Sequence, residues 1–101
     1  MVLELAILKI KPNELEGFGQ NLEKAQAVIN QSPGYLGHEF QQCIETPNKY
    51  ILLIQWESLE AHEEGFRKSD LFKEWRGLIG GYFAAPPQVD HYNLKFSHAK
   101  R

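Results

Sequence analysis

Two segments of this chain are apolar on both of their alternating sets of side chains, and this pattern most constrains the fold. They are VLELAILKI (residues 2–10) and KYILLIQW (residues 49–56). Successive side chains of a β-strand point to opposite faces of the sheet, so these strands need cover on both faces. A layer of helices covers one face, and a second copy of the same sheet can cover the other in a two-fold dimer. We therefore expect a homodimer joined through the open sheet face.

The segments around these strands follow a recognisable order. The apolar residues that recur at helical spacing after the first strand are Leu15, Phe18, Leu22, Ala25 and Ile29. A strand-like run, YLGHEFQQCI (35–44), precedes residues 49–56 across the hairpin-length loop ETPN. Two short helices are expected over 59–67 and 70–79, and a last strand over 88–96. The order βαββαβ predicts an α+β, ferredoxin-like fold, with an antiparallel four-stranded sheet and helices on one face.

Three helix starts carry sequence signals. Asn13 and Glu16 have the spacing of a capping box, in which the asparagine accepts from the first turn and the glutamate reaches back. Ser58 and Ser69 precede the two short helices, and acidic residues follow each of them, as the helix dipole favours. We expect all three side chains to cap the helices that they precede.

Length and charge limit the number of domains and the classes of partner that the chain can have. The chain has 101 residues, the size of one domain, with an expected core over about 2–96 and a polar tail over 97–101. A formal charge of −2, without a basic patch, argues against a nucleic-acid surface or a polybasic membrane anchor. No apolar run reaches the roughly 20 residues of a membrane span. Cys43 is the single cysteine, so an intrachain disulfide is impossible, which suits the cytoplasm.

Several motifs together resemble one known family. They are the strand ending in WES, the helix start SDLFKEW, the run FAAPPQVDHY and the Pro-Gly turn of SPGYLGHEF. Over about residues 2–95 the chain resembles the antibiotic biosynthesis monooxygenase (ABM) domain family of the dimeric α/β-barrel superfamily. The resemblance implies a cofactor-independent monooxygenase that oxidises a small electron-rich aromatic, phenolic or polyketide-like, with O₂. The alternative is a non-catalytic small-molecule-binding or stress-associated protein on the same scaffold, since a fold does not fix a function.

The haem-degrading branch of that superfamily can be compared position by position. That branch has an Asn on the first strand, a Trp three residues before the Ser of the SD motif and a His seven residues after it. Here the first strand has no Asn, and the other two positions hold Phe66 and Arg76. An arginine cannot act as a neutral imidazole ligand to iron. Haem degradation is therefore the less favoured activity, and no haem, flavin or metal is expected.

His62 is the first candidate for a catalytic residue. It lies three residues after Leu59 and four before Phe66, so the three side chains share one helical face. That face must meet the sheet, and we expect the His62 ring to face a cavity there. In the cavity it would act as a general base or hydrogen-bond donor to a phenol. The alternative is a buried structural histidine bonded to a backbone carbonyl.

His91 and Arg76 are the other two candidates. His91 and Tyr92 point to opposite faces of the last strand, so one of them can enter the cavity, or both can lie at a dimer interface. Arg76 can reach the cavity and stabilise a phenolate or an oxyanion. An arginine on such a helix more often pairs with surface carboxylates.

Aromatic side chains are the candidates for substrate contacts. Those expected to line a pocket for a flat aromatic ligand, or else to pack in the core, are Trp56, Phe66, Phe72, Trp75, Tyr82 and Tyr92. A metal site built from His38, His62 and His91 is not expected, because no ligand-spaced motif such as HxxxH is present. We interpret His38 as structural.

Overall fold

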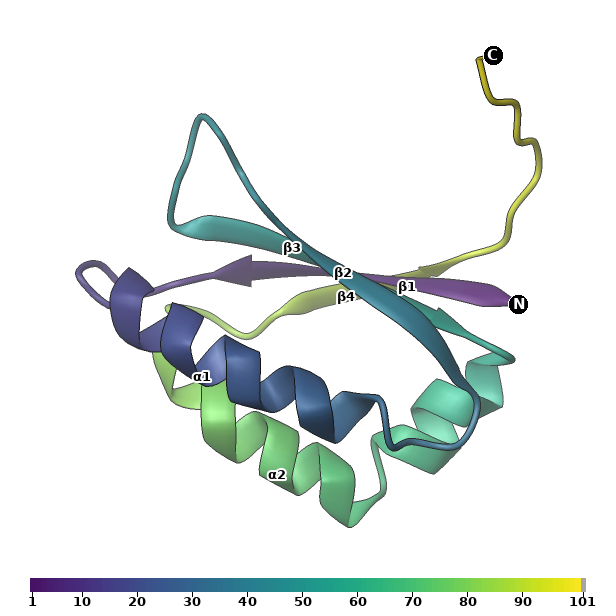
Figure 1. Cartoon of the computed structure of the whole chain (residues 1–101), viewed down its shortest axis with the longest axis horizontal. Helices are drawn as coiled ribbons and strands as arrows, with labels where there is room; N and C mark the ends of the chain where they lie inside the picture. Colours follow the sequence, from purple (N-terminus) through teal and green to yellow (C-terminus); the bar gives the residue numbers. More distant parts are fainter. Residues whose placement is uncertain (101) are drawn as a thin grey trace.

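The computed structural model describes residues 1–100, so Arg101, the last residue of the expected polar tail, lies outside it. The elements follow one another as β1 (Val2–Lys9), α1 (Leu15–Ile29), β2 (Tyr35–Gln42), β3 (Lys49–Trp56), the π-helical turn η1 (Ala61–Phe66), α2 (Asp70–Ile79), the 3₁₀ turn η2 (Gly80–Tyr82) and β4 (Gln88–Tyr92). This order confirms the predicted βαββαβ fold, with the second helical segment in two pieces. Figure 1 shows the helices together on one side of the sheet.

The sheet is antiparallel throughout, with the strand order β2-β3-β1-β4. Glu4 of β1 lies opposite Ile54 of β3 on one side and opposite His91 of β4 on the other. Glu4 is therefore in the middle of a row of side chains that all face the helices. This register places one acidic residue and one histidine side by side beneath the helical layer.

The two serine caps are confirmed, whereas the capping box is wrong. Ser69 Oγ accepts a hydrogen bond from Phe72 N at 3.3 Å, and Ser58 Oγ accepts one from Ala61 N at 3.1 Å. Asn13 instead adopts a left-handed backbone conformation with φ of 65°, which asparagine tolerates better than most residues. The helix α1 begins after Glu14 and has no side-chain cap.

Three predicted strands end earlier than their apolar runs. β1 ends at Lys9, and Ile10 makes an isolated bridge with Phe83. β2 ends at Gln42 and β4 at Tyr92, so residues 43–44 and 93–96 are not strand. The loop that joins β2 to β3 begins at Cys43, whose N–H donates a hydrogen bond to Lys49 O at 2.8 Å. Tyr92 is paired with Leu3, close to the start of β1 at Val2. The residues after Tyr92 therefore extend beyond the end of the strand with which β4 pairs.

The core lies between the sheet and the helices. Its fully buried members include Phe18 and Ile29 of α1, Ile54 and Trp56 of β3, and Ile79 of α2. The opposite face of the sheet carries no helix within residues 1–100 (Figure 1). Its apolar side chains are only half-buried in the single chain, and they are Leu3, Leu5, Ile7, Ile51 and Leu53. Within the same residues, every helix is too short or too polar to cross a membrane.

Candidate functional site

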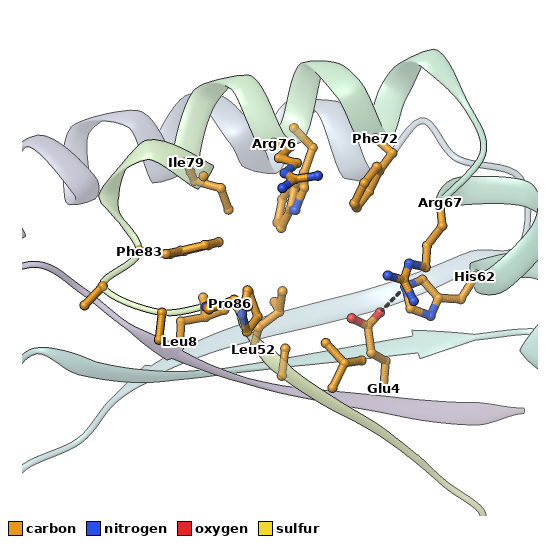
Figure 2. Close-up of a pocket in the computed structure, with 17 residues that line it drawn as sticks. Glu4, Leu8, Leu52, His62, Arg67, Phe72, Arg76, Ile79, Phe83 and Pro86 are labelled. Carbon is orange, nitrogen blue, oxygen red and sulfur yellow. Dashed lines mark ion pairs between the residues drawn. The ribbon is translucent and has the colours of Figure 1, made fainter.

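A cavity of about 540 Å³ lies between α2 and the strands β1, β3 and β4. This is within the range of small-molecule sites, about 300–1,000 Å³. Most of its wall is apolar, from β1, β3, β4, α2 and the segment 83–87 (Figure 2). The polar side chains that line it are Glu4, His62, Arg67 and Arg76. The arrangement is therefore an apolar pocket with a few converging polar groups.

Glu4 is the buried carboxyl group of this cavity. The alternation of β1 puts it on the helix-facing side with Ala6 and Leu8, and only 5% of its surface is exposed. Trp56 Nε1 donates a hydrogen bond to Glu4 Oε1 at 2.9 Å, and His62 Nε2 lies 3.2 Å from the same oxygen. Both contacts use Oε1, so Oε2 remains for a ligand in the cavity.

Burial controls the ionisation of Glu4. Loss of hydration disfavours the carboxylate and raises the pKa of Glu4 to about 7. The hydrogen bond from Trp56 and the positive charge of Arg67 oppose this rise, whereas the nearby carboxylate of Glu63 adds to it. A carboxyl group with such a pKa exchanges its proton near neutral pH.

His62 lies on η1 and connects Glu4 to the edge of the sheet. Its ring stacks on Trp56, with centroids 5.3 Å apart and an interplanar angle of 21°. Its Nε2 faces Glu4, and its Nδ1 lies 2.8 Å from Nε2 of His91. Burial, followed by repulsion from His91, lowers the pKa of His62 to about 4. The imidazole is therefore neutral near pH 7, and each of its two nitrogens has a partner.

Two arginines stand at the border of the cavity. Arg76 extends from α2 over the cavity, and Arg67 follows η1 near Glu4 (Figure 2). Nη1 of Arg67 also lies 3.5 Å from Oε2 of Glu63, in a partly exposed ion pair. A guanidinium at the border of an apolar pocket can stabilise negative charge that develops inside it.

A second polar cluster lies on the other side of His62. His62, Glu63 and His91 each place one ligand-type atom within 4.8 Å of the others. Oε1 of Glu63 is 3.8 Å from Nε2 of His91. These three residues are the ones in residues 1–100 whose geometry is compatible with a metal ion.

The candidate residues from the sequence separate into three groups. His62, Arg76, Phe72 and Trp75 line the cavity. His91 is on the helix-facing side of β4 but contacts the cavity only through His62. The remaining aromatics lie elsewhere: Trp56 and Phe66 are core residues, Tyr82 packs against α1 near Gly17, and Tyr92 is 48% exposed.

Glu4 and Arg67 are the polar cavity residues that the sequence interpretation missed. Glu4 carries no predicted role, although it stands within the apolar run of residues 2–10. A signal was present, because Glu4 shares its strand face with Ala6, Leu8 and Ile10, which all become buried. A lone carboxylate on a core-facing strand face is costly, and such groups are usually functional or paired. Arg67 had no comparable signal, since it follows a surface helix.

His38 has a structural environment, as the sequence suggested. Its Nδ1 lies 2.5 Å from the Tyr35 hydroxyl and its Nε2 lies 3.2 Å from Oε1 of Gln26 on α1. Burial lowers the pKa of His38. The residue therefore links β2 to α1, away from the cavity.

The fold and cavity define a small α+β domain of the ferredoxin-like type, and a family comparison specifies it further. The model of the family "Antibiotic biosynthesis monooxygenase" (ABM) matches residues 1–78. That match covers most of the chain, which therefore belongs to the ABM family.

Individual relatives agree with this assignment. The chain is 38% identical over 92 residues to YczJ, an uncharacterised protein of Bacillus subtilis. The match covers 91% of this chain and 97% of YczJ. A Bordetella bronchiseptica structure assigned to antibiotic biosynthesis monooxygenases is 33% identical, with a TM-score of 0.90 over 94% of this chain and 97% of its own. SnoaB, a cofactor-independent oxygenase from Streptomyces nogalater, has a TM-score of 0.80 at 11% identity, covering 98% and 97% of the two chains. At that identity the likeness shows the fold alone.

Proposed function

We propose that this protein is a monooxygenase that oxidises a small electron-rich aromatic compound with O₂, without a redox cofactor. The observation that carries the proposal is a buried carboxyl group, Glu4, in the wall of an apolar cavity of about 540 Å³. Membership of the ABM family supports the reaction class. The cofactor-independent oxygenase from Streptomyces nogalater, which shares the fold, supports the absence of a redox group.

The proposed reaction needs a base, a stabilised anion and a dry pocket. Oε2 of Glu4 removes a proton from an activated C–H bond of a phenolic substrate. The resulting carbanion is delocalised onto the phenolic oxygen, where Arg76 stabilises it. The carbanion carbon then forms a bond to O₂, and protonation gives a hydroperoxide. The reacting carbon carries a second hydrogen, which is lost as a proton while the O–O bond breaks and hydroxide departs. A carbonyl group remains, so one oxygen atom enters the product and the other leaves as water.

In this mechanism the role expected for His62 moves to Glu4. Nε2 of His62 contacts Glu4 Oε1 at 3.2 Å, and Nδ1 faces His91 instead of the cavity centre. His62 therefore positions the carboxyl group that acts as the base. Trp56 does the same through its indole N–H, although it is a core residue. His91 has no direct contact with a substrate in the cavity.

The non-catalytic alternative predicts a different interior. A pocket filled by Trp75 and Phe66 would favour a binding or stress-associated protein. In the structure Trp75 lies in the cavity wall and Phe66 in the core, so neither side chain fills the cavity. An open cavity that contains a carboxyl group favours the enzyme.

Glu4→Gln tests the proposal, because glutamine can still accept the hydrogen bond from Trp56 but cannot take a proton. Oxygen consumption would be followed with anthrone, an aromatic ketone with an acidic C–H bond, in the wild type and in this variant. We expect turnover to fall by about 10²–10⁴-fold, the usual contribution of a general base. Glu64→Gln is the matched control, since Glu64 is an exposed carboxylate paired with Lys68.

Two results would contradict the proposal. Unchanged turnover in Glu4→Gln would exclude Glu4 as the base. Anthrone binding by the wild type, seen as a thermal shift but without oxygen consumption by any phenolic substrate tested, would favour the non-catalytic alternative.

We further propose that the working unit is a homodimer joined through the open sheet face. That face carries a row of half-buried apolar side chains from β1 and β3. Leu36 and Tyr92, which are about half exposed, extend the apolar surface to β2 and β4. A contiguous apolar patch of this kind on a small domain marks an interaction site, and like faces pair symmetrically.

A further inference from the structure

We propose that His62, Glu63 and His91 form a binding site for one divalent transition-metal ion of the zinc type. The three residues come from η1 and β4, and the fold brings their ligand atoms within 4.8 Å of one another. Two imidazoles and one carboxylate suit zinc, with the fourth position left for water. This site adjoins the cavity and shares His62 with its wall, but Glu63 and His91 lie outside the cavity lining, and the proposal does not require the oxygenation proposed above.

The distances are close to those that a zinc ion needs. Zinc–nitrogen bonds of about 2.0–2.1 Å at a tetrahedral angle put two ligand nitrogens roughly 3.3 Å apart. Nδ1 of His62 and Nε2 of His91 are 2.8 Å apart, and Oε1 of Glu63 is 3.8 Å from the same His91 nitrogen. The first of these distances is about half an ångström shorter than that spacing and the second about half an ångström longer, so movements of the half-buried side chains of Glu63 and His91 would bring the ligand atoms into position.

Glu4 fixes the imidazole of His62 in the form that a metal requires. Its buried carboxyl group lies 3.2 Å from Nε2, and Trp56 anchors the same oxygen. With the proton on Nε2, the lone pair of Nδ1 points toward His91. A metal-bound histidine almost always donates its second N–H to a carboxylate or carbonyl in this way.

The surroundings allow an ion to enter and remain. The side chains of His91 and Glu63 are 21% and 38% exposed, so the ion can arrive from solvent, while His62 forms the buried end. Arg67 opposes a cation, but its guanidinium pairs with Oε2 of Glu63 and leaves Oε1 free for the ion. The π-helical turn that carries His62 and Glu63 is a geometry frequent at functional sites.

This proposal departs from the expectation that no metal is bound. That expectation relied on the absence of a ligand-spaced motif within one element. His62 and His91 are separated by 29 positions and meet only because β4 pairs with β1 beside η1. Without a metal, the same nitrogens form an ordinary hydrogen bond, which is the competing explanation.

Titration calorimetry with ZnCl₂ distinguishes the two explanations. The protein would first be treated with a chelator and then titrated above pH 7, where His62 is neutral. We expect one zinc ion per chain, and at least tenfold weaker binding in His91→Ala and in Glu63→Gln. Glu4→Gln, which changes the support of His62, should weaken binding by about 10–100-fold. Co²⁺ in place of zinc should give the visible absorption of a tetrahedral site.

Two matched variants serve as controls. Glu64→Gln removes the neighbouring carboxylate, which pairs with Lys68, and His38→Ala removes a histidine that links β2 to α1. Both should bind zinc as the wild type does. Absence of binding by the wild type would overturn the proposal, as would binding that His91→Ala and Glu63→Gln leave unchanged. Circular dichroism would establish that each variant is folded before titration.

Discussion

The two halves of the helical layer cover the same sheet face, but one is filled and the other is hollow. Beneath α1, Phe18 is completely buried and meets Tyr50 edge-on, with ring centroids 5.1 Å apart. Beneath α2, a cavity of about 540 Å³ separates the helix from β1 and β4. Both helices are amphipathic, so amphipathic character alone does not decide whether the space below a helix is filled.

The difference teaches where this small domain can hold a polar group. A carboxyl group in the filled half would lose its hydration and gain few partners, at a cost of several kcal/mol. In the hollow half Glu4 keeps one oxygen toward the cavity, while Trp56 and His62 hold the other. The packed half therefore supplies stability, and the hollow half carries the buried carboxyl group.

The largest expected effect is a loss of stability when a phenylalanine ring is removed from the filled half, compared with the same change in the hollow half. Phe18→Ala should lower the free energy of unfolding by about 3–5 kcal/mol, because it leaves a new void in a filled region. Phe72→Ala should cost less than about 2 kcal/mol, because Phe72 is half-buried and already borders open space. Urea denaturation of both variants measures the contrast. Equal losses would mean that the two halves are packed alike in solution.

The next effect concerns the charge of Glu4. Because burial raises its pKa to about 7, the folded state holds this proton more tightly than the unfolded chain does. The tighter proton binding by Glu4 stabilises the folded state. This contribution to the free energy of unfolding is fully present below the ordinary glutamate pKa, and it is lost as the pH rises through about 7. Glu4→Gln abolishes this loss, so at pH 8 the variant should be more stable than the wild type by up to about 3 kcal/mol.

Thermal unfolding at pH 5 and pH 8, with a chelator present, measures that difference. Glu64→Gln, at an exposed position, should show the wild-type pH dependence. If Glu4→Gln also follows the wild-type pH dependence, the carboxyl group ionises as it would in water and the hollow half is well hydrated.

A substitution on the open sheet face should have the smallest effect on the stability of the single chain. Its effect on the dimer should nevertheless be large. Leu53→Glu places a charge in the middle of β3 on that face and should convert a dimer into monomers. The fold within each chain should lose only about 1 kcal/mol, as is usual for a partly exposed strand position. Sedimentation at micromolar concentration measures the change.

Gln20→Glu, on the solvent side of α1, adds the same charge and should leave the dimer intact. A wild type that is monomeric would contradict the proposal.

The sequence predicts the fold well, because local signals agree with one another along most of the chain. Apolar periodicity located the helices and strands, and Ser58 and Ser69 marked two helix starts that the structure confirms. Asn13 failed as a cap, since its left-handed backbone depends on the turn after Pro12 and not on its spacing to Glu16. Strand ends were misjudged where pairing stops before apolar residues do, as at Tyr92.

The site was only partly predictable, because it depends on register between distant strands. His62 was found from its helical face, and Arg76 was named as an arginine able to reach the cavity. The pairing of Glu4 with His91 across β1 and β4 could not be read from either segment alone. The contact between His62 and His91 has the same origin, and it brings two of the proposed metal ligands together.

The chain has two tryptophans, and both border the groups discussed here. Trp56 donates its indole proton to Glu4 and stacks on His62, while Trp75 forms part of the cavity wall. Indole emission is sensitive to nearby charge and to contacts with aromatic molecules. The protein thus contains its own optical reporters: one for the ionisation of the carboxyl group, and one for the arrival of a ligand. Replacing each tryptophan by phenylalanine in turn would separate the two signals without an added dye.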